Sequence, residues 1–463
     1  MVWQRALFAV VVLFFLFFRL GNAPVYEYDE ARNGINAVEM LENGHWRGLW
    51  FANAPDTWGN KPPLFIWTLA GSFSLLGLNT LALRLPSALA MLGALFFIFL
   101  TCRWYYGEVF AMLVCLVLLS VSGLVGKHTG RTGDFDAMLI FFLMANTFFF
   151  LRYFSEGRER DLSAASLLLA GAFLTKGPAM AVLISGQFLF LALTGKWRLL
   201  KVKILLRQAL LFAAIPMIWL LFINEDQAPL RLISYDLVQR FSDTGFETPQ
   251  SPSRFTFLWV CLDAYFNSWN YVLYALLALA ILFPKRIGFR WAWKENPLLV
   301  YAFACWVSLG LGLSLAATTH RWYFSPALPF VAISLVFLIC EMAKRRVVWV
   351  LFGGLLLFTL TRRALEISIP KKEIPAIIAQ SGAFLERAGR VYYIGNFLSQ
   401  STLLYLYFAK PGLVFVPSLE KLPVLKSGDA VVAVRNEAGK AFFEQVGWEL
   451  KYEDELYLVA EKE

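Results

Sequence analysis

Residues 109–151 read VFAMLVCLVLLSVSGLVGKHTGRTGDFDAMLIFFLMANTFFFL, two apolar runs separated by one charged loop. The runs at 109–126 and 137–151 contain no Asp, Glu, Lys or Arg, whereas the loop at 127–136 contains four of these residues and a histidine. Runs of this length are typical of helices that cross a lipid bilayer, with thinning of the bilayer around the shorter ones. The stretch therefore predicts two membrane helices joined by a charged loop at the membrane surface.

The whole chain has the composition of a membrane protein. Of its 463 residues, 59% are hydrophobic and 16% are charged, and the mean hydropathy is +0.59. The chain also contains 43 Phe and 16 Trp, an apolar surface that a soluble globule cannot remove from water. The sequence therefore predicts an all-α polytopic membrane domain with membrane lipids as its surroundings.

Apolar segments of spanning length recur up to residue 361 and predict about eleven spans. The first segment follows Arg5 but lacks a small-residue cleavage site, so we expect it to remain as a helix rather than to be removed as a signal peptide. The predicted spans are 6–21, 83–102, 109–126, 137–151, 162–175, 179–194, 205–223, 264–283, 297–317, 323–341 and 347–361.

The basic residues predict the orientation of these spans. Clusters of Lys and Arg fall between alternate spans, and the positive-inside rule places such clusters in the cytoplasm. This alternation requires the apolar residues 61–78 to lie in the membrane interface instead of forming a further span. The formal charge of +9 is then explained by topology, so no nucleic-acid partner is expected. The basic segments are Arg5, Arg103, Arg152–Arg160, Lys196–Arg207, Lys285–Lys294 and Lys344–Arg346.

We expect the chemistry on the opposite, extracytoplasmic side. Ionisable groups near lipid are costly unless they have a function or form an ion pair. The five cysteines lie in or beside apolar runs and the three histidines have no paired spacing, so neither a disulfide framework nor a metal site is expected. The loops on this side are 22–82, 127–136, 176–178, 224–263 and 318–322, followed by the chain after residue 362.

A small soluble α/β domain is expected after the last span. The chain then divides into a transmembrane catalytic domain at 1–363 and an extracytoplasmic α/β domain at 364–463. Apolar periodicity predicts the elements of the second domain. They are a helix at 371–388, strands at 391–394, 414–416 and 430–434, a helix at 437–446 and a hairpin at 448–459.

Two carboxylates and a guanidinium follow the first span, at Asp29, Glu30 and Arg32. Asp29 is suited to act as a base or to orient an acceptor hydroxyl, and Glu30 is a neighbouring acid for the same task. A structural alternative stands beside this interpretation. In it, Asp29 caps a helix, the next acid lies in the first turn, and Arg32 is a local ion-pair partner.

Two further clusters combine cations with helix starts. Lys61 precedes two prolines at the mouth of an apolar segment, where its ammonium is suited to meet a phosphate. The alternative is a lysine that snorkels from the end of an interfacial helix. The loop at 127–136 contributes Arg131, and either Asp134 or Asp136 is expected to cap the helix that follows.

The last cluster stands at the head of the predicted span 323–341. Arg321 is suited to clamp a phosphate through two parallel hydrogen bonds, and Tyr323 lies beside it in the sequence. His320 and Trp322 complete the cluster. The alternative is a belt of aromatic and basic residues that anchors the chain at the membrane interface.

In order and spacing these clusters resemble the membrane glycosyltransferases of the GT-C fold. The likeness is to the bacterial branch that contains the lipid A aminoarabinose transferase, and to relatives of the protein O-mannosyltransferases. It covers residues 1–335, and the ordered set carries it rather than any single motif. The matching stretches are Asp29–Arg32, Lys61–Trp67, Gly130–Asp136, Thr175–Pro178 and Arg321–Pro329.

The resemblance implies roles for individual residues. Asp29 takes the catalytic role and Asp136 corresponds to the acid of the second loop, while the sequence leaves Glu30 open as the acting acid. The aminoarabinose transferase has an acid where this chain has Asn60, so no metal contact is expected there and no cofactor is implied. The groups expected around the donor phosphate are Arg32, Lys61, Arg131, Arg321 and, as a looser match, Tyr323.

The activity that the resemblance implies is inverting transfer of one sugar from a polyprenyl phosphate, such as undecaprenyl phosphate. The acceptor is a lipid, a glycan or a protein on the extracytoplasmic side of a bacterial inner membrane. No Gly-rich nucleotide loop is present, in keeping with a lipid-linked donor. The alternative is a transporter or flippase for a lipid-linked or anionic solute, whose charged residues line a path near the bilayer midplane.

Overall fold

The computed structural model describes most of the chain. Asn60, most of the loop 224–263 and the basic segment Lys285–Lys294 lie outside the described residues, as do Lys344 and Arg345. The described residues are 2–56, 61–221, 257–266, 268–282, 296–315, 320–342, 346–369, 374–394, 399–416, 418, 421–435 and 437–462.

The chain forms two compact units, each built from segments that are distant in the sequence. The first unit, called the helical unit below, comprises Met1–Arg19, Asn60–Phe65 and Pro86–Ile369. The second, called the mixed unit, comprises Leu20–Gly59, Ile66–Leu85 and Pro370–Glu463. The C-terminal sheet therefore shares its unit with the residues that follow the first helix, while the functional division at residue 363 stays a prediction.

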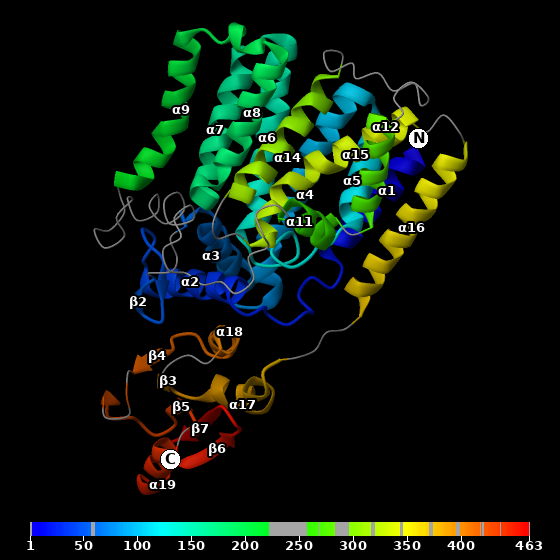
Figure 1. Ribbon diagram of the computed structural model, residues 1–463. Coiled ribbons are helices and arrows are strands. Elements are labelled where there is room, and N and C mark those ends of the chain that lie inside the picture. Colours follow the sequence, from blue (N-terminus) through cyan, green and yellow to red (C-terminus); the bar gives the residue numbers. More distant parts are fainter. Residues whose placement is uncertain are drawn as a thin grey trace. The chain divides into compact units, whose positions relative to one another are not determined.

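The helical unit is a bundle in which α6, α7, α8 and α14 lie side by side (Figure 1). In the described part of this unit, the short 3-10 helices η1 (Gly177–Met180), η2 (Lys196–Leu199) and η5 (Arg321–Ala327) lie between the longer helices. The α-helices are α1 (Val2–Phe17), α4 (Thr80–Tyr106, which begins in the mixed unit), α5 (Glu108–Ser120), α6 (Phe135–Glu156), α7 (Glu159–Lys176), α8 (Ala181–Thr194), α9 (Val202–Leu221), α11 (Phe257–Phe266), α12 (Trp269–Leu282), α14 (Pro297–Leu315), α15 (Leu328–Met342) and α16 (Arg346–Ser368).

Among the described residues, seven helices are long and apolar enough to cross a membrane. They are α4, α6, α7 with η1, α9, α14, η5 with α15, and α16. Every predicted spanning segment contains a helix, although α1, α5, α8 and α12 are shorter than a full span. The chain is thus a multi-pass membrane protein, and its exact number of spans stays a prediction. Residues 61–78 contain α3 (Leu64–Leu76), a short apolar helix.

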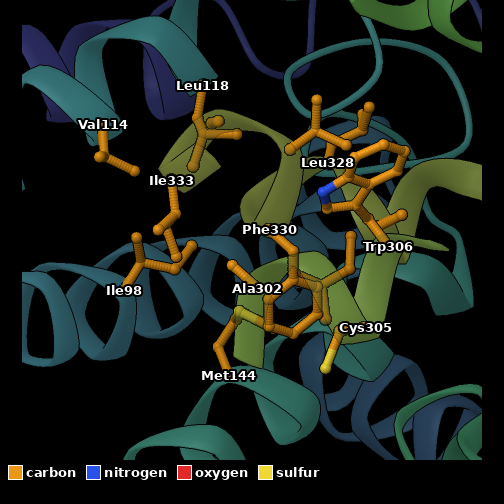
Figure 2. Close-up of a cluster of buried hydrophobic side chains, with 14 of the residues drawn as sticks. Ile98, Val114, Leu118, Met144, Ala302, Cys305, Trp306, Leu328, Phe330 and Ile333 are labelled. Carbon is orange, nitrogen blue, oxygen red and sulfur yellow. The ribbon is translucent and has the colours of Figure 1, made fainter. Parts of the chain in front are cut away.

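The core of the helical unit consists of aliphatic and aromatic side chains from several helices. Ile98 of α4, Leu118 of α5 and Ile333 of α15 are each at most 2% exposed. Figure 2 shows these side chains with Phe330 and Met144 between the ribbons. Because helices in lipid gain little from the hydrophobic effect between themselves, close packing of such side chains must hold the bundle together.

Small residues allow some of these helices to approach closely. A Cβ atom added at Gly186 of α8 would lie 2.7 Å from the Cα of Cys305 in α14, which is far inside van der Waals contact. The absence of a side chain at this position therefore brings the two backbones together, as is typical of membrane helix pairs.

The mixed unit contains a five-stranded sheet in the order β4-β3-β5-β7-β6. β3 is parallel to β4 and β5, whereas β7 is antiparallel to β5 and β6. Its elements are α2 (Asp29–Asn43), β1 (Trp50–Phe51), β2 (Ala54–Pro55), most of α3, α17 (Ala376–Arg387), β3 (Val391–Ile394), α18 (Gln400–Ala409), β4 (Val414–Val416), β5 (Ala430–Val434), α19 (Glu437–Gln445), β6 (Glu449–Glu453) and β7 (Tyr457–Glu461).

The predicted α/β elements of the tail are confirmed, and one helix was not predicted. β3, β4 and β5 have the predicted bounds, and the C-terminal hairpin is formed by β6 and β7. The additional helix α18 packs against α2, where a Cβ on Gly34 would lie 2.5 Å from a methyl carbon of Leu404. The Tyr407 hydroxyl also donates a hydrogen bond to Glu39 of α2, at 2.8 Å.

We expect Gly186→Ala to lower the melting temperature of the purified protein in detergent. The added methyl group clashes with the backbone of α14, a cost of about 1–3 kcal/mol, which exceeds the gain in helix propensity of about 1 kcal/mol. The matched control is Gly312→Ala in α14, where nothing lies within 4 Å of the added Cβ. Equal melting temperatures for the two variants would contradict this close approach.

Candidate active site

The charged loop before α6 separates the roles of its two acids. Asp134 is the N-cap of α6, and its side chain accepts a hydrogen bond of 2.7 Å from the backbone N–H of Phe135. Its backbone carbonyl accepts a hydrogen bond of 3.1 Å from the hydroxyl of Ser87. Of the two acids expected to cap this helix, Asp134 therefore does so, and Asp136 lies in the first turn.

Asp136 forms a buried ion pair with Lys176 at the end of α7. The two residues are 1% and 9% exposed. The Lys176 ammonium also lies 5.4 Å from the ring centroid of Tyr323. Removing one partner of such a pair leaves an uncompensated charge, at a typical cost of about 3–5 kcal/mol. The ion pair therefore links the start of α6 to the end of α7.

Lys61 lies beside this pair. Its ammonium is 4.6 Å from the ring centroid of Phe135, and its charge interacts with both Asp134 and Asp136. Burial alone raises the pKa of the Asp134 carboxyl, but the hydrogen bond with His128 and the charges of Lys61 and Lys176 outweigh it and lower this pKa. The fold thus gathers two lysines and two aspartates at the start of α6.

Aromatic rings connect this cluster to η5. The Nδ1 atom of His128 lies 2.9 Å from Oδ2 of Asp134. The rings of His128 and His320 both stack on Trp322, with centroids 4.4 and 4.3 Å from it. Trp322 therefore contacts two imidazole rings, in the segment that carries Arg321 and Tyr323.

The two predicted arginines of the helical unit have different surroundings. The Arg131 guanidinium donates hydrogen bonds to the carbonyls of Phe15, Leu16 and Phe18, at 2.9, 3.1 and 2.7 Å, where α1 ends. Arg321 is exposed and interacts electrostatically with Tyr265, which also interacts with Asp136. Arg131 thus satisfies the end of a helix, whereas Arg321 lies near the cluster of lysines and aspartates.

In the mixed unit, Glu30 belongs to a buried ion pair. Both of its carboxylate oxygens accept hydrogen bonds from Arg84, at 2.7 and 2.9 Å, and the two side chains are at most 2% exposed. Arg84 also donates hydrogen bonds to the backbone carbonyls of Leu20, Ala23 and Pro24. The Glu30–Arg84 pair therefore fixes the chain that leads into α2.

Asp29 and Arg32 stand on the first turn of α2. Tyr28 occupies the N-cap position and Asp29 begins the helix, so the interpretation of Asp29 as the cap is wrong. Arg32 forms an ion pair with the buried Asp56, and Asn36 donates a hydrogen bond of 3.1 Å to the same carboxylate. Arg32 is thereby held in place, while Asp29 is half-buried.

Several residues of these clusters were not predicted as site residues. Lys176 lies inside the stretch Thr175–Pro178 that carried part of the resemblance, which was the available signal. Arg84 falls within an apolar segment and Asp56 within a long loop, and neither forms part of a motif. Their importance follows from their partners, which lie 54 and 24 residues away.

Two comparisons with known proteins bear on the sequence and on the fold of the chain. A family model described as dolichyl-phosphate-mannose-protein mannosyltransferase matches residues 60–222. The structure resembles that of ArnT from Cupriavidus metallidurans bound to undecaprenyl phosphate, with a TM-score of 0.73 and 18% sequence identity over 99% of this chain and 97% of that chain. The expected GT-C fold is thereby confirmed.

Curated relatives match only part of the chain. An uncharacterized protein from Aquifex aeolicus is 28% identical over 195 residues, which are 42% of this chain and 38% of the relative. The undecaprenyl phosphate-alpha-4-amino-4-deoxy-L-arabinose arabinosyl transferase of Shewanella sediminis is 32% identical over 175 residues, 36% of this chain and 31% of the relative. The chain thus spans less than two fifths of the length of these two relatives.

We expect Glu30→Gln to destabilise the fold more than it slows chemistry. The substitution leaves Arg84 buried without its counter-charge, a loss of about 3–5 kcal/mol. The measurement is the melting temperature in detergent beside the turnover of the folded fraction. The control is Glu108→Gln, because Glu108 pairs with Arg5 at the surface, where a pair is worth about 0–1 kcal/mol. A Glu30→Gln protein that melts normally but has no activity would show that Glu30 is the catalytic carboxylate.

Proposed function

We propose that this chain is an inverting glycosyltransferase that moves one monosaccharide from a polyprenyl phosphate donor to a lipid, glycan or protein acceptor. The observation that carries the proposal is the segment matched by the mannosyltransferase family model, because it contains Lys61, Asp136 and Lys176, which cluster in the fold. The ArnT structure of the same fold was solved with undecaprenyl phosphate, which supports a donor of this class.

The chemistry of such a donor matches the cations of the cluster. The bond between the anomeric carbon and the phosphate oxygen breaks while a bond from the acceptor oxygen forms on the opposite face, so the anomeric centre is inverted. Lys61, assisted by Arg321 and Tyr323, stabilises the leaving phosphate, and a single group of this kind is typically worth about 3–4 kcal/mol. Arg32 and Arg131 add positive charge from the positions in which Asp56 and the end of α1 hold them.

Asp29 is the residue that we assign to the acceptor. Its carboxylate takes the proton of an acceptor hydroxyl as the oxygen attacks, which is general base catalysis. Its half-buried position at the first residue of α2 leaves part of the side chain open to an incoming acceptor. Asp136 remains a proposed site residue, in the ion pair with Lys176.

The location of the charges favours an enzyme over a transporter. A transporter or flippase carries its ionisable residues along a path near the bilayer midplane, often in broken helices. Here Asp136 lies in the first turn of α6, Lys176 is the last residue of α7, and Lys61 precedes α3. Charges at the ends of helices are suited to a site at the membrane surface.

We also propose an orientation and a cellular location. Residues 1–363 form the transmembrane catalytic domain of a bacterial inner membrane protein, and Asp29 and residues 364–463 face the extracytoplasmic side. The support is the positive-inside rule, applied to the basic segments that alternate with the acidic and aromatic loops.

Asp29→Asn tests the catalytic assignment. We expect turnover of an undecaprenyl phosphate sugar by the purified protein in detergent to fall about 100- to 10,000-fold, because the amide cannot accept the proton. The melting temperature is expected to change little, since a first-turn acid contributes about 1 kcal/mol or less. Glu42→Gln, near the other end of α2, serves as the matched control. Near-normal turnover of Asp29→Asn would end the assignment of Asp29 as the base.

Cysteine labelling tests the orientation. Val424 is 95% exposed, and we expect an impermeant maleimide to label Val424→Cys in intact cells. Lys201→Cys, in a basic segment, is expected to react only after lysis. The five native cysteines are buried or half-buried, which keeps the background low. Labelling of Val424→Cys only after lysis would reverse the proposed topology.

A further inference from the structure

We propose that the stack of His128, Trp322 and His320 is a positioning element that holds Arg321 and Tyr323 ready for the donor phosphate. The inference rests on the proposed function and adds three positioning residues to it. None of the three needs to touch the donor. They act through the backbone of η5, which carries the two residues assigned to the phosphate.

Two imidazole rings stack on the indole of Trp322. The rings of His128 and Trp322 are 11° from parallel, and those of His320 and Trp322 are 8° from parallel. Centroid distances of 4.3 and 4.4 Å are short for aromatic stacking, so both rings are in contact with the indole. Trp322 therefore cannot change its side-chain rotamer without separating both contacts.

The stack joins two segments that are distant in the sequence. His128 lies in the loop before α6 with a backbone φ of 66°, in the left-handed region, and its ring is tied to Asp134 at 2.9 Å. Asp134 is itself fixed as the N-cap of α6. The side chains of His128 and Asp134 thus connect Trp322 to α6, a helix of 22 residues.

The backbone hydrogen bonds of this segment contribute little to its rigidity. η5 is a 3-10 helix of seven residues, and such helices have poor hydrogen-bond geometry. At its start, the Tyr323 N–H donates a hydrogen bond of 3.1 Å to the His320 carbonyl. The His320 ring also meets the edge of the Tyr323 ring, at 5.3 Å and 82°. Side-chain contacts must therefore supply the rigidity of the segment.

Rigidity at this place has a direct effect on binding. Arg321 and Tyr323 flank Trp322 in the sequence, so the stack restrains their backbone on the two sides of one residue. A group that is fixed before its ligand arrives loses less conformational entropy on binding. A membrane-interface anchor, the alternative for this cluster, needs an indole at the lipid surface but no imidazole rings stacked on it.

The experiment measures binding of undecaprenyl phosphate to the full-length protein in detergent, together with the melting temperature. We expect Trp322→Leu to weaken this binding about tenfold, equivalent to about 1.4 kcal/mol, because both ring contacts are lost. Trp322→Phe keeps an aromatic face for each imidazole and is expected to recover most of the affinity. His128→Asn, which removes one face, is expected to give an intermediate loss.

The chain offers a matched control in the mixed unit. Trp448 stacks on Phe443, with ring centroids 5.6 Å apart and planes 23° from parallel. Trp448→Leu removes the same atoms from an aromatic stack that lies far in the sequence from every residue assigned to the donor or the acceptor. Its affinity for undecaprenyl phosphate is expected to equal that of the wild type, whatever its effect on melting.

Each outcome separates this inference from the proposed function. If the wild type does not bind undecaprenyl phosphate, the proposed function fails. If the wild type binds and Lys61→Ala does not, the donor site stands, and an unchanged affinity of Trp322→Leu then overturns the positioning role. A loss of affinity that Trp322→Phe does not recover, or that Trp448→Leu shares, also overturns it, because a general loss of stability would then explain the result.

Discussion

A charge beside lipid must have a partner, and this constraint governs the described structure. Lys176 pairs with Asp136, Arg84 pairs with Glu30, and Arg131 satisfies the carbonyls at the end of α1. Each of these partners lies at or near the end of a helix, where the chain leaves the apolar layer. The middle of α6 can therefore remain uncharged, and an unpaired ionisable group there would cost several kcal/mol.

This constraint explains how much of the fold was predictable. Uncharged runs marked every spanning segment, and short strand-like apolar runs marked β3, β4 and β5. The bounds of some helices were not predictable, because an apolar residue can also lie in a buried loop. The run at 109–126 is an example: α5 ends at Ser120, and the carbonyl of Val125 beyond it accepts a hydrogen bond of 2.7 Å from Arg363. A distant side chain here replaces the helical hydrogen bonds that composition alone suggested.

The helix α18 was missed for a related physical reason. Residues 402–407 are all buried, so both sides of the helix are covered and no amphipathic period appears in the sequence. The candidate site was likewise predictable only in part. Charged residues stood out against an apolar background, which predicted Lys61, Asp136 and Arg321, but their partners depend on the fold. Lys176 lies 40 residues from Asp136, and no local pattern relates the two.

The partners of the acids also determine which of these acids is suited to act as a general base. Asp134 caps α6 and binds His128, Glu30 is enclosed with Arg84, and Asp136 is enclosed with Lys176. A general base must meet its acceptor and then release the proton, so it needs access that a carboxylate in a buried ion pair lacks. Asp29 alone among these four acids is half-buried rather than buried. The half-buried position of Asp29 thus directs the proposal of proton transfer to this residue.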